Sequence, residues 1–268
     1  MKHLILVILS IGWFCTFARG DEPATAPSLP TLWVIGDSTV SNPQKGMAGW
    51  GTPVGKYFDS SKIRVVNKAR GGRSSRTYIA EGLWDQVVPQ IKQGDFVIVQ
   101  FGHNDGGAVN GPKVTGRASL PGNGEQTEAT TRPSGETEIV HTFGWYMRKY
   151  AGDAKAKGAT VILCSHIPRR EWEADGTVQR NANSFGKWTR EAAEQSGAYF
   201  LDLNEIIAKH YEQIGRERVA ADFFAQDHTH TTIAGAELNA KCVIEGIKGL
   251  KDCPLAQMLS AEGQAVQP

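Results

Sequence analysis

The chain has 268 residues, of which 40% are hydrophobic, and its formal net charge is +1. This length and apolar content predict one globular domain with a sizeable core. The nearly balanced charge gives no reason to expect nucleic acid or an anionic membrane surface as a partner, and we expect neither.

The first twenty residues, MKHLILVILSIGWFCTFARG, have the features of a secretory signal peptide. A basic start precedes an apolar stretch, and the small residues Ala18 and Gly20 stand three and one positions before the expected cleavage. An uncleaved membrane anchor is the alternative. Without residues 1–20, 27 basic residues face 28 acidic ones. Residues 21–30 predict a disordered leader, and we expect a protein that is secreted or periplasmic.

From residue 31 the chain alternates short apolar runs with segments of helical spacing. Val and Ile on both alternating faces of the runs predict strands buried in a parallel sheet. The helical segments include an apolar face from Ile139 to Ala154 and another from Ile233 to Ile247. This order predicts a three-layer α/β/α sandwich of about five strands over residues 31–250, followed by a tail at 251–268. The predicted strands are 32–36, 63–67, 95–101, 160–165 and 198–203.

Residues 106–136 are rich in Gly, Pro and Thr and have no hydrophobic period. Irregular segments of this length are usually functional or disordered. This one follows the third predicted strand, and open parallel sheets bind ligands beyond the carboxyl ends of their strands. We therefore expect the segment to border a site and to contribute substrate binding.

Polar motifs follow the first two predicted strands. Ser38 in GDSTV comes directly after the first strand and is either a helix N-cap or a nucleophile. Gly71 and Gly72 follow the second strand in NKARGGRSSRT. They either form a simple turn or bring a main-chain N–H group close to a reacting oxygen.

Two further motifs complete the set. The third strand runs into QFGHNDGG, where the Asn104 amide is a neutral donor suited to a developing oxyanion. Near the C-terminus, DHTHTTIAG places Asp227 three residues before His230. This spacing lets an aspartate orient a histidine as a general base, although a polar turn that caps the next helix is the alternative.

Together the four segments resemble the four blocks of the SGNH (GDSL-like) hydrolases: G-D-S, an isolated Gly, G-x-N-D and D-x-x-H, in that order. The resemblance implies that Ser38 is the nucleophile and that Asp227 and His230 complete a catalytic triad. It implies an oxyanion hole formed by Ser38, Gly72 and Asn104. The first block reads GDST, a departure shared by the rhamnogalacturonan acetylesterase branch, which GRSSRTY and FVIVQFGHNDGG also resemble.

The resemblance further implies a flavodoxin-like sheet and a serine esterase that needs no cofactor and no metal. Its expected reaction is removal of O-acetyl groups from a plant cell-wall polysaccharide through an acetyl-enzyme. The expected polysaccharide is rhamnogalacturonan or pectin. Acetyl xylan is the alternative substrate. The expected partner is an acetylated polysaccharide or oligosaccharide, and the expected oligomeric state is a monomer.

Two other functional classes are weighed against the esterase. A metal-dependent phosphoesterase would take its ligands from a scattered set, although their order departs from known signatures. That set is Asp37, His103, Asp105, His228 and His230. A non-catalytic carbohydrate-binding protein would use tryptophans for stacking on sugar rings. The candidates are Trp50, Trp84, Trp145 and Trp172.

Several arginines fall on or near the predicted loops at the strand ends. Arginine binds carboxylates bidentately, so these residues are candidates for holding a uronate, with solvated surface or structural ion pairs as the alternative. The substrate-binding candidates are Arg73, Arg117, Arg132 and Arg169. Among the cysteines, Cys164 is expected to be a buried thiol, and a disulfide between Cys242 and Cys253 is left open.

Overall fold

The computed structural model describes residues 29–112, 114–132, 134–224 and 226–267. The predicted signal peptide, residues 1–20, lies outside the described residues, as does most of the predicted leader. The predicted cleavage and the membrane-anchor alternative therefore stay predictions. No helix within the described ranges combines the length and the apolar character that crossing a bilayer requires.

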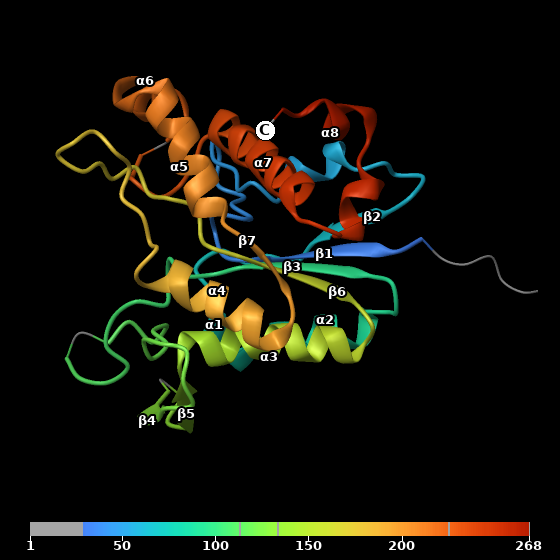
Figure 1. Cartoon of the computed structure of the whole chain (residues 1–268). Coiled ribbons are helices and arrows are strands. Elements are labelled where there is room, and N and C mark those ends of the chain that lie inside the picture. The colour runs from blue at the N-terminus through green and yellow to red at the C-terminus, as the bar shows by residue number, and fades with distance from the viewer. Residues whose placement is uncertain (1–28, 113, 133, 225, 268) are drawn as a thin grey trace, which may run out of the picture.

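A five-stranded parallel sheet forms the middle layer of the molecule (Figure 1). Its order, β2-β1-β3-β6-β7, is the flavodoxin-like order once the strands of this sheet alone are counted. The prediction of an α/β/α sandwich with about five parallel strands is confirmed. The strands are β1 Thr31–Gly36, β2 Arg64–Asn67, β3 Phe96–Gln100, β6 Thr160–Cys164 and β7 Tyr199–Leu201.

Successive side chains of the central strands enter two separate cores. In β1, Leu32 and Val34 pack in the core on one face, and Trp33 and Ile35 pack in the core on the other. This alternation is the period of two that a strand imposes, and it explains why the runs are apolar at every position. The parallel sheet is thus buried on both sides.

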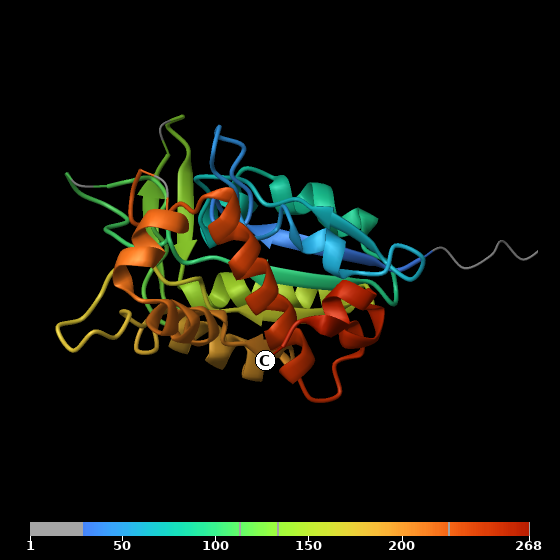
Figure 2. The same cartoon turned by 90° about the horizontal axis from the view of Figure 1, so that it is seen from above.

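Helices cover both faces of the sheet (Figures 1 and 2). One face carries α1 Ser75–Ala80, α2 Leu83–Val87, α3 Phe143–Ala156 and α4 Phe185–Ser196. The other carries α5 Leu203–Ile214, α7 Ile233–Gly249 and α8 Ala261–Ala265. Shorter elements are η1 Val54–Tyr57, η2 Val88–Gln90, α6 Arg216–Asp222 and η3 Pro254–Met258.

Residues after 250 belong to the packed domain, which corrects the predicted tail. Cys253, Leu255 and Leu259 are buried in the same core as α5 and α7. Leu259 also forms a bridge with Phe58 beside η1. The domain therefore extends to the end of α8. These apolar residues belong to the core that α5 and α7 form with the sheet.

The segment 106–136 is more ordered than its composition indicates. It contains β4 Thr127–Thr131, which pairs antiparallel with β5 Thr137–His141. Val109, Ala118 and Val140 form a small separate core beneath this hairpin. Ile139, predicted to start the face of a helix, lies in β5 and is 51% exposed.

The three cysteines outside the first twenty residues, Cys164, Cys242 and Cys253, are free and buried. Cys164 matches the expectation of a buried thiol. The possibility of a bridge between Cys242 and Cys253 is not realised in the structure.

Candidate active site

Ser38 lies in a tight turn directly after β1. The backbone N–H groups of Val40 and Ser41 donate to the carbonyl of Asp37, at 3.2 and 3.0 Å. Because this turn does not open into a helix, the N-cap interpretation of Ser38 does not apply. Ser38 instead lies just past the carboxyl end of β1, the strand that pairs with both β2 and β3. In this strand order that position is the topological switch point, where doubly wound sheets bind their ligands.

A buried chain of hydrogen bonds fixes the turn from below. The Asp37 carboxylate accepts from the backbone N–H and the hydroxyl of Thr39, at 2.8 and 2.7 Å. The Gln100 amide donates to that hydroxyl at 2.7 Å, and the Trp50 indole donates to the Gln100 oxygen at 2.8 Å. Burial raises the pKa of Asp37 to about 6. The chain links the Ser38 turn to the end of β3 and limits its movement.

His230 and Asp227 complete a continuous hydrogen-bonded row with Ser38. The Nε2 atom of His230 is 2.9 Å from the Ser38 hydroxyl, and its Nδ1 atom is 2.7 Å from Asp227 Oδ2. The other Asp227 oxygen accepts from the backbone N–H groups of Thr229 and His230, each at 2.7 Å. Burial raises the pKa of Asp227, but these hydrogen bonds outweigh it and lower the pKa to about 2. Asp227 is therefore a carboxylate that holds the imidazole with Nε2 toward the serine.

The segment that carries these two residues is anchored on both sides. The Thr231 hydroxyl donates to the Ala48 carbonyl at 2.8 Å, and Thr232 caps α7 by accepting from Gly235 N–H at 3.1 Å. His228 points elsewhere: its Nδ1 atom lies 3.6 Å from Glu171, and its side chain is 53% exposed. The structure thus brings His230, and not His228, to the serine.

The expected oxyanion donors share one cavity with Ser38 and His230. Ser38, Gly72, Asn104 and His230 line a cavity of about 590 Å³. Gly72 has φ +77°, a left-handed conformation that favours glycine. Within the described residues, neither the Ser38 nor the Gly72 backbone N–H group has a hydrogen-bond acceptor. Both groups are available to a ligand oxygen in this cavity.

The amide of Asn104 is oriented by contacts at both ends. Its nitrogen donates to the Arg73 carbonyl at 3.0 Å, and its oxygen accepts from Arg117 Nη1 at 2.8 Å. The same Arg117 nitrogen donates to the Gly72 carbonyl at 3.3 Å. The amide nitrogen therefore keeps one N–H for the cavity. Arg117, predicted as a substrate-binding residue, instead contacts both Asn104 and Gly72, so the segment 106–136 supports the site as well as bordering it.

Asp105 supports the same loop from inside the protein. Its carboxylate accepts from the backbone N–H of Ser75 at 3.0 Å, and the Ser75 hydroxyl donates to it as well. Its own carbonyl accepts from Ser119 N–H at 3.0 Å. Burial raises the pKa of Asp105 to about 7, although the hydrogen bonds from Ser75 act in the opposite direction.

Replacing Asp105 by Asn tests this burial. In wild type the pKa of the Asp105 carboxyl is about 7 in the folded protein and 3.8 in the unfolded chain. The free energy of unfolding of wild type therefore decreases as the pH rises through that window. Asparagine keeps an acceptor for Ser75 and does not titrate. We expect the stability of Asp105→Asn relative to wild type to rise between pH 4 and 8, by on the order of 4 kcal/mol at most. Urea unfolding at several pH values measures this difference, and parallel curves for the two proteins would contradict it.

The four candidate arginines separate into two groups. Arg73 pairs with Glu81 at 2.8 Å, and Arg132 pairs with Glu138 at 2.9 Å. Their charges are already compensated, so they are poor candidates for a substrate carboxylate. Arg117 and Arg169 form no ion pair with a carboxylate among the described residues; Arg117 contacts Asn104, and Arg169 contacts the His103 carbonyl. These two lie on either side of the Asn104 loop.

The ligand set considered for a metal-dependent phosphoesterase is not assembled. Asp37 is hydrogen-bonded to Thr39, and Asp105 is hydrogen-bonded to Ser75. His230 is hydrogen-bonded to Ser38 and Asp227. A different group with metal-ligand spacing lies between α5 and α7, where ligand atoms fall within 4.8 Å of one another. It consists of His210, Cys242 and Glu245. His210 is hydrogen-bonded to Glu245 at 2.7 Å, and neither side chain lines the Ser38 cavity.

The tryptophans considered for sugar stacking are mostly engaged in the protein. Trp50 and Trp84 are fully buried, and Trp145 stacks on His141 with ring centroids 3.7 Å apart. Trp172 packs against the guanidinium of Arg216. None of the four lines the cavity that holds Ser38. These positions do not favour a binding protein without catalysis.

A serine hydroxyl held by an imidazole and a carboxylate at the switch point of a parallel α/β sheet defines the class of α/β serine hydrolases. The chain belongs to the GDSL-like Lipase/Acylhydrolase family, whose model matches residues 34–238. It is therefore an ester hydrolase, as the SGNH resemblance implies.

Two curated relatives cover most of the chain. The rhamnogalacturonan acetylesterase of Emericella nidulans is 33% identical over 81% of this chain and 84% of its own length. The probable rhamnogalacturonan acetylesterase YesY of Bacillus subtilis is 28% identical over 86% of this chain and 98% of its own. Among solved structures, the Bacillus subtilis protein YxiM matches with a TM-score of 0.66 at 27% identity. That match covers 83% of this chain but only 57% of YxiM.

Proposed function

We propose that this protein is a secreted serine esterase that removes O-acetyl groups from a plant cell-wall polysaccharide, with rhamnogalacturonan as its substrate. The observation that carries the proposal is the row from Ser38 through His230 to Asp227, with hydrogen bonds of 2.9 and 2.7 Å. The substrate class is supported by the relatives named as rhamnogalacturonan acetylesterases. Acetyl xylan is the alternative substrate, and a monomer is the proposed state.

The geometry supports acyl transfer in two halves. His230 Nε2 accepts the proton of Ser38 as its oxygen attacks the acetyl carbonyl, and Asp227 stabilises the imidazolium that forms. The carbonyl oxygen becomes negatively charged and accepts from the N–H groups of Ser38, Gly72 and Asn104. His230 then protonates the departing sugar oxygen, which leaves an acetyl group on Ser38. In the second half His230 activates a water molecule, and acetate is released.

Acetate release from a set of polymers tests the substrate. We expect kcat/KM on acetylated rhamnogalacturonan to exceed that on acetylated xylan by tenfold or more, because remote contacts add binding energy to the preferred polymer. A preference for xylan would replace the proposed substrate and leave the chemistry in place. No hydrolysis of any acetyl ester, together with no labelling by a serine-directed fluorophosphonate, would favour a carbohydrate-binding protein instead.

Secretion is proposed from residues 1–20 alone and has its own test. Expression of the full chain in a secreting host should yield exported protein whose N-terminal residue is Asp21. Protein that stays in the membrane fraction with residues 1–20 intact would show an anchor.

Asn104 provides a prediction about the oxyanion. Asn104→Ala removes one donor and should reduce kcat by about 10²–10³ with little change in KM, because the contact strengthens only as negative charge develops. Steady-state kinetics on p-nitrophenyl acetate measures both constants. A change in KM alone would make Asn104 a substrate-binding residue.

A further inference from the structure

A second cavity lies beside the one that holds Ser38, and the loop after β3 separates them. Asn104 lines the Ser38 cavity, while His103 and Gly106 of the same loop line a cavity of about 390 Å³. The other wall of this second cavity comes from the segment after β6, which includes Pro168 and Arg169. Neighbouring residues of one loop thus face two cavities, within the reach of one extended polymer.

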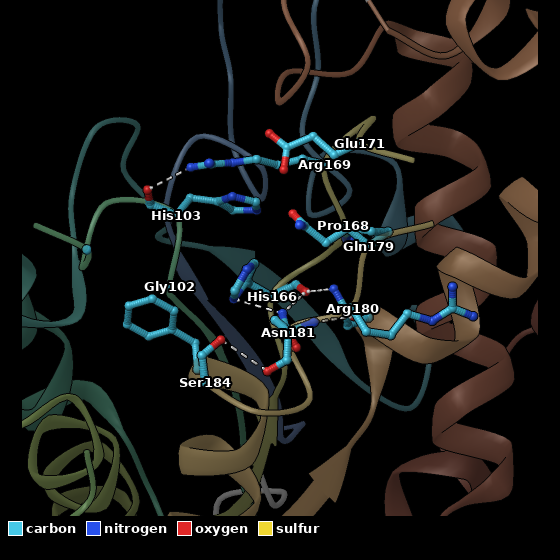
Figure 3. Close-up of a pocket in the computed structure, with 13 residues that line it drawn as sticks. Gly102, His103, His166, Pro168, Arg169, Glu171, Gln179, Arg180, Asn181 and Ser184 are labelled. Atoms are coloured by element: carbon cyan, nitrogen blue, oxygen red, sulfur yellow. Dashed lines mark hydrogen bonds between the residues drawn. The ribbon is translucent and has the colours of Figure 1, made fainter. Parts of the chain in front are cut away.

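The guanidinium of Arg169 lies over His103 at the edge of this cavity (Figure 3). Its Nη2 atom donates to the His103 carbonyl at 3.3 Å. Its Nε atom is buried and has no hydrogen-bond partner among the described residues. A buried donor without a partner is destabilising, so an acceptor that enters the cavity and binds this group is favoured.

The other arginine that lines the cavity is already compensated. Arg180 is ion-paired with Glu205 at 2.9 Å and also with Glu212. Glu171, the one carboxylate among the described residues that line the cavity, lies 3.6 Å from the Nδ1 atom of His228 and forms no ion pair with Arg169. The positive charge of Arg169 is therefore the one in this cavity that no described carboxylate neutralises.

Neutral imidazoles complete the polar lining. Burial lowers the pKa of His166 to about 3 and lowers the pKa of His103 well below its usual value. The rings lie 4.6 Å apart, and His166 fits against Gly102, where a Cβ atom would come within 2.3 Å of its Nδ1. Both ring nitrogens of His103 are buried without a partner. Neutral rings supply donors and acceptors for sugar hydroxyls and add no charge.

We propose that this cavity is a subsite for the carboxylate of a uronic acid unit of the polymer, with Arg169 as the residue that binds it. The inference rests on the proposed function, since the polymer named for the relatives contains galacturonic acid. A planar guanidinium matches a planar carboxylate with two parallel N–H···O bonds, which a neutral sugar cannot form. Because Nε is buried, the proposed bond from this atom requires the side chain to turn toward the cavity when the carboxylate binds.

The kinetic test compares one acetylated rhamnogalacturonan oligosaccharide with free carboxylates and the same material after methyl esterification. A charge-assisted bidentate contact corresponds to about 10- to 100-fold in kcat/KM. We expect wild type to prefer the free acid by that factor, Arg169→Gln to lose the preference, and Arg169→Lys to keep part of it. Arg132→Gln removes the same charge from an arginine that is paired with Glu138, and it should retain the preference.

A binding measurement separates failure of the subsite from failure of the proposed function. Titration calorimetry with the deacetylated acid and its methyl ester needs no turnover. Tighter binding of the acid to wild type, lost in a folded Arg169→Gln protein, supports the subsite even if no acetyl ester is hydrolysed. Equal binding of the acid and the ester by wild type overturns the subsite, and it does so even if the protein hydrolyses both.

Discussion

Replacing Ser38 by Ala is expected to lower kcat on any acetyl ester by about 10⁴–10⁶-fold, the largest effect of a single side chain in this protein. The hydroxyl is the attacking atom in the proposed reaction, and its 2.9 Å contact with His230 is the path by which its proton leaves. Alanine removes the attacking oxygen and its contact with His230. The oxyanion donors remain, so a small residual rate above that of water is expected. Steady-state acetate release measures the change.

The fold of the variant is the necessary control for this result. Ser38 is outside the buried chain formed by Asp37, Thr39 and Gln100, so Ser38→Ala should unfold at the same urea concentration as wild type. A fluorophosphonate should label wild type on the peptide that contains Ser38 and should not label the variant. Near-normal turnover by a folded Ser38→Ala protein would eliminate the serine-esterase mechanism.

The central fold could be predicted because each sheet strand carries its own signal. Strands buried on both faces are apolar at successive positions, as in β1 and β3. The hairpin of β4 and β5 has no comparable signal, since each strand buries one side chain, Thr130 or Val140. Its small core also includes Val109 and Ala118, which lie outside both strands. The pattern within either strand cannot show such a contact.

The proximity of Ser38, His230 and Asp227 could be predicted for a related reason. Parallel strands bring their carboxyl ends to one edge, so motifs at those ends are close in space although Ser38 and His230 are 192 residues apart. The sequence could not show in this way which of the four candidate arginines are ion-paired. Whether Arg132 or Arg169 has a glutamate partner depends on side-chain contacts between distant segments, and no sequence period encodes these contacts. The role of Arg117 beside Asn104 was missed for the same reason.

The two histidines of DHTH give the second large expected effect. His230→Ala should reduce kcat by about 10⁴-fold or more, because the imidazole is the group that moves every proton in the proposed reaction. His228→Ala should change kcat by no more than about fivefold, since it loses an exposed contact with Glu171, and such pairs contribute little. The two variants are matched, because each removes one imidazole from the same turn.

A double variant makes this comparison sharper. Ser38 and His230 act as one unit in the proposed mechanism, so His230→Ala in the Ser38→Ala background should have almost no additional effect on kcat. His228→Ala in that background should keep its own small effect, because it acts independently. Rates for the three single variants, the two double variants and wild type on one acetyl ester provide the measurement. If His228→Ala were the more damaging change, the general base would be His228, and the 2.9 Å contact between His230 and Ser38 would not be the proton path.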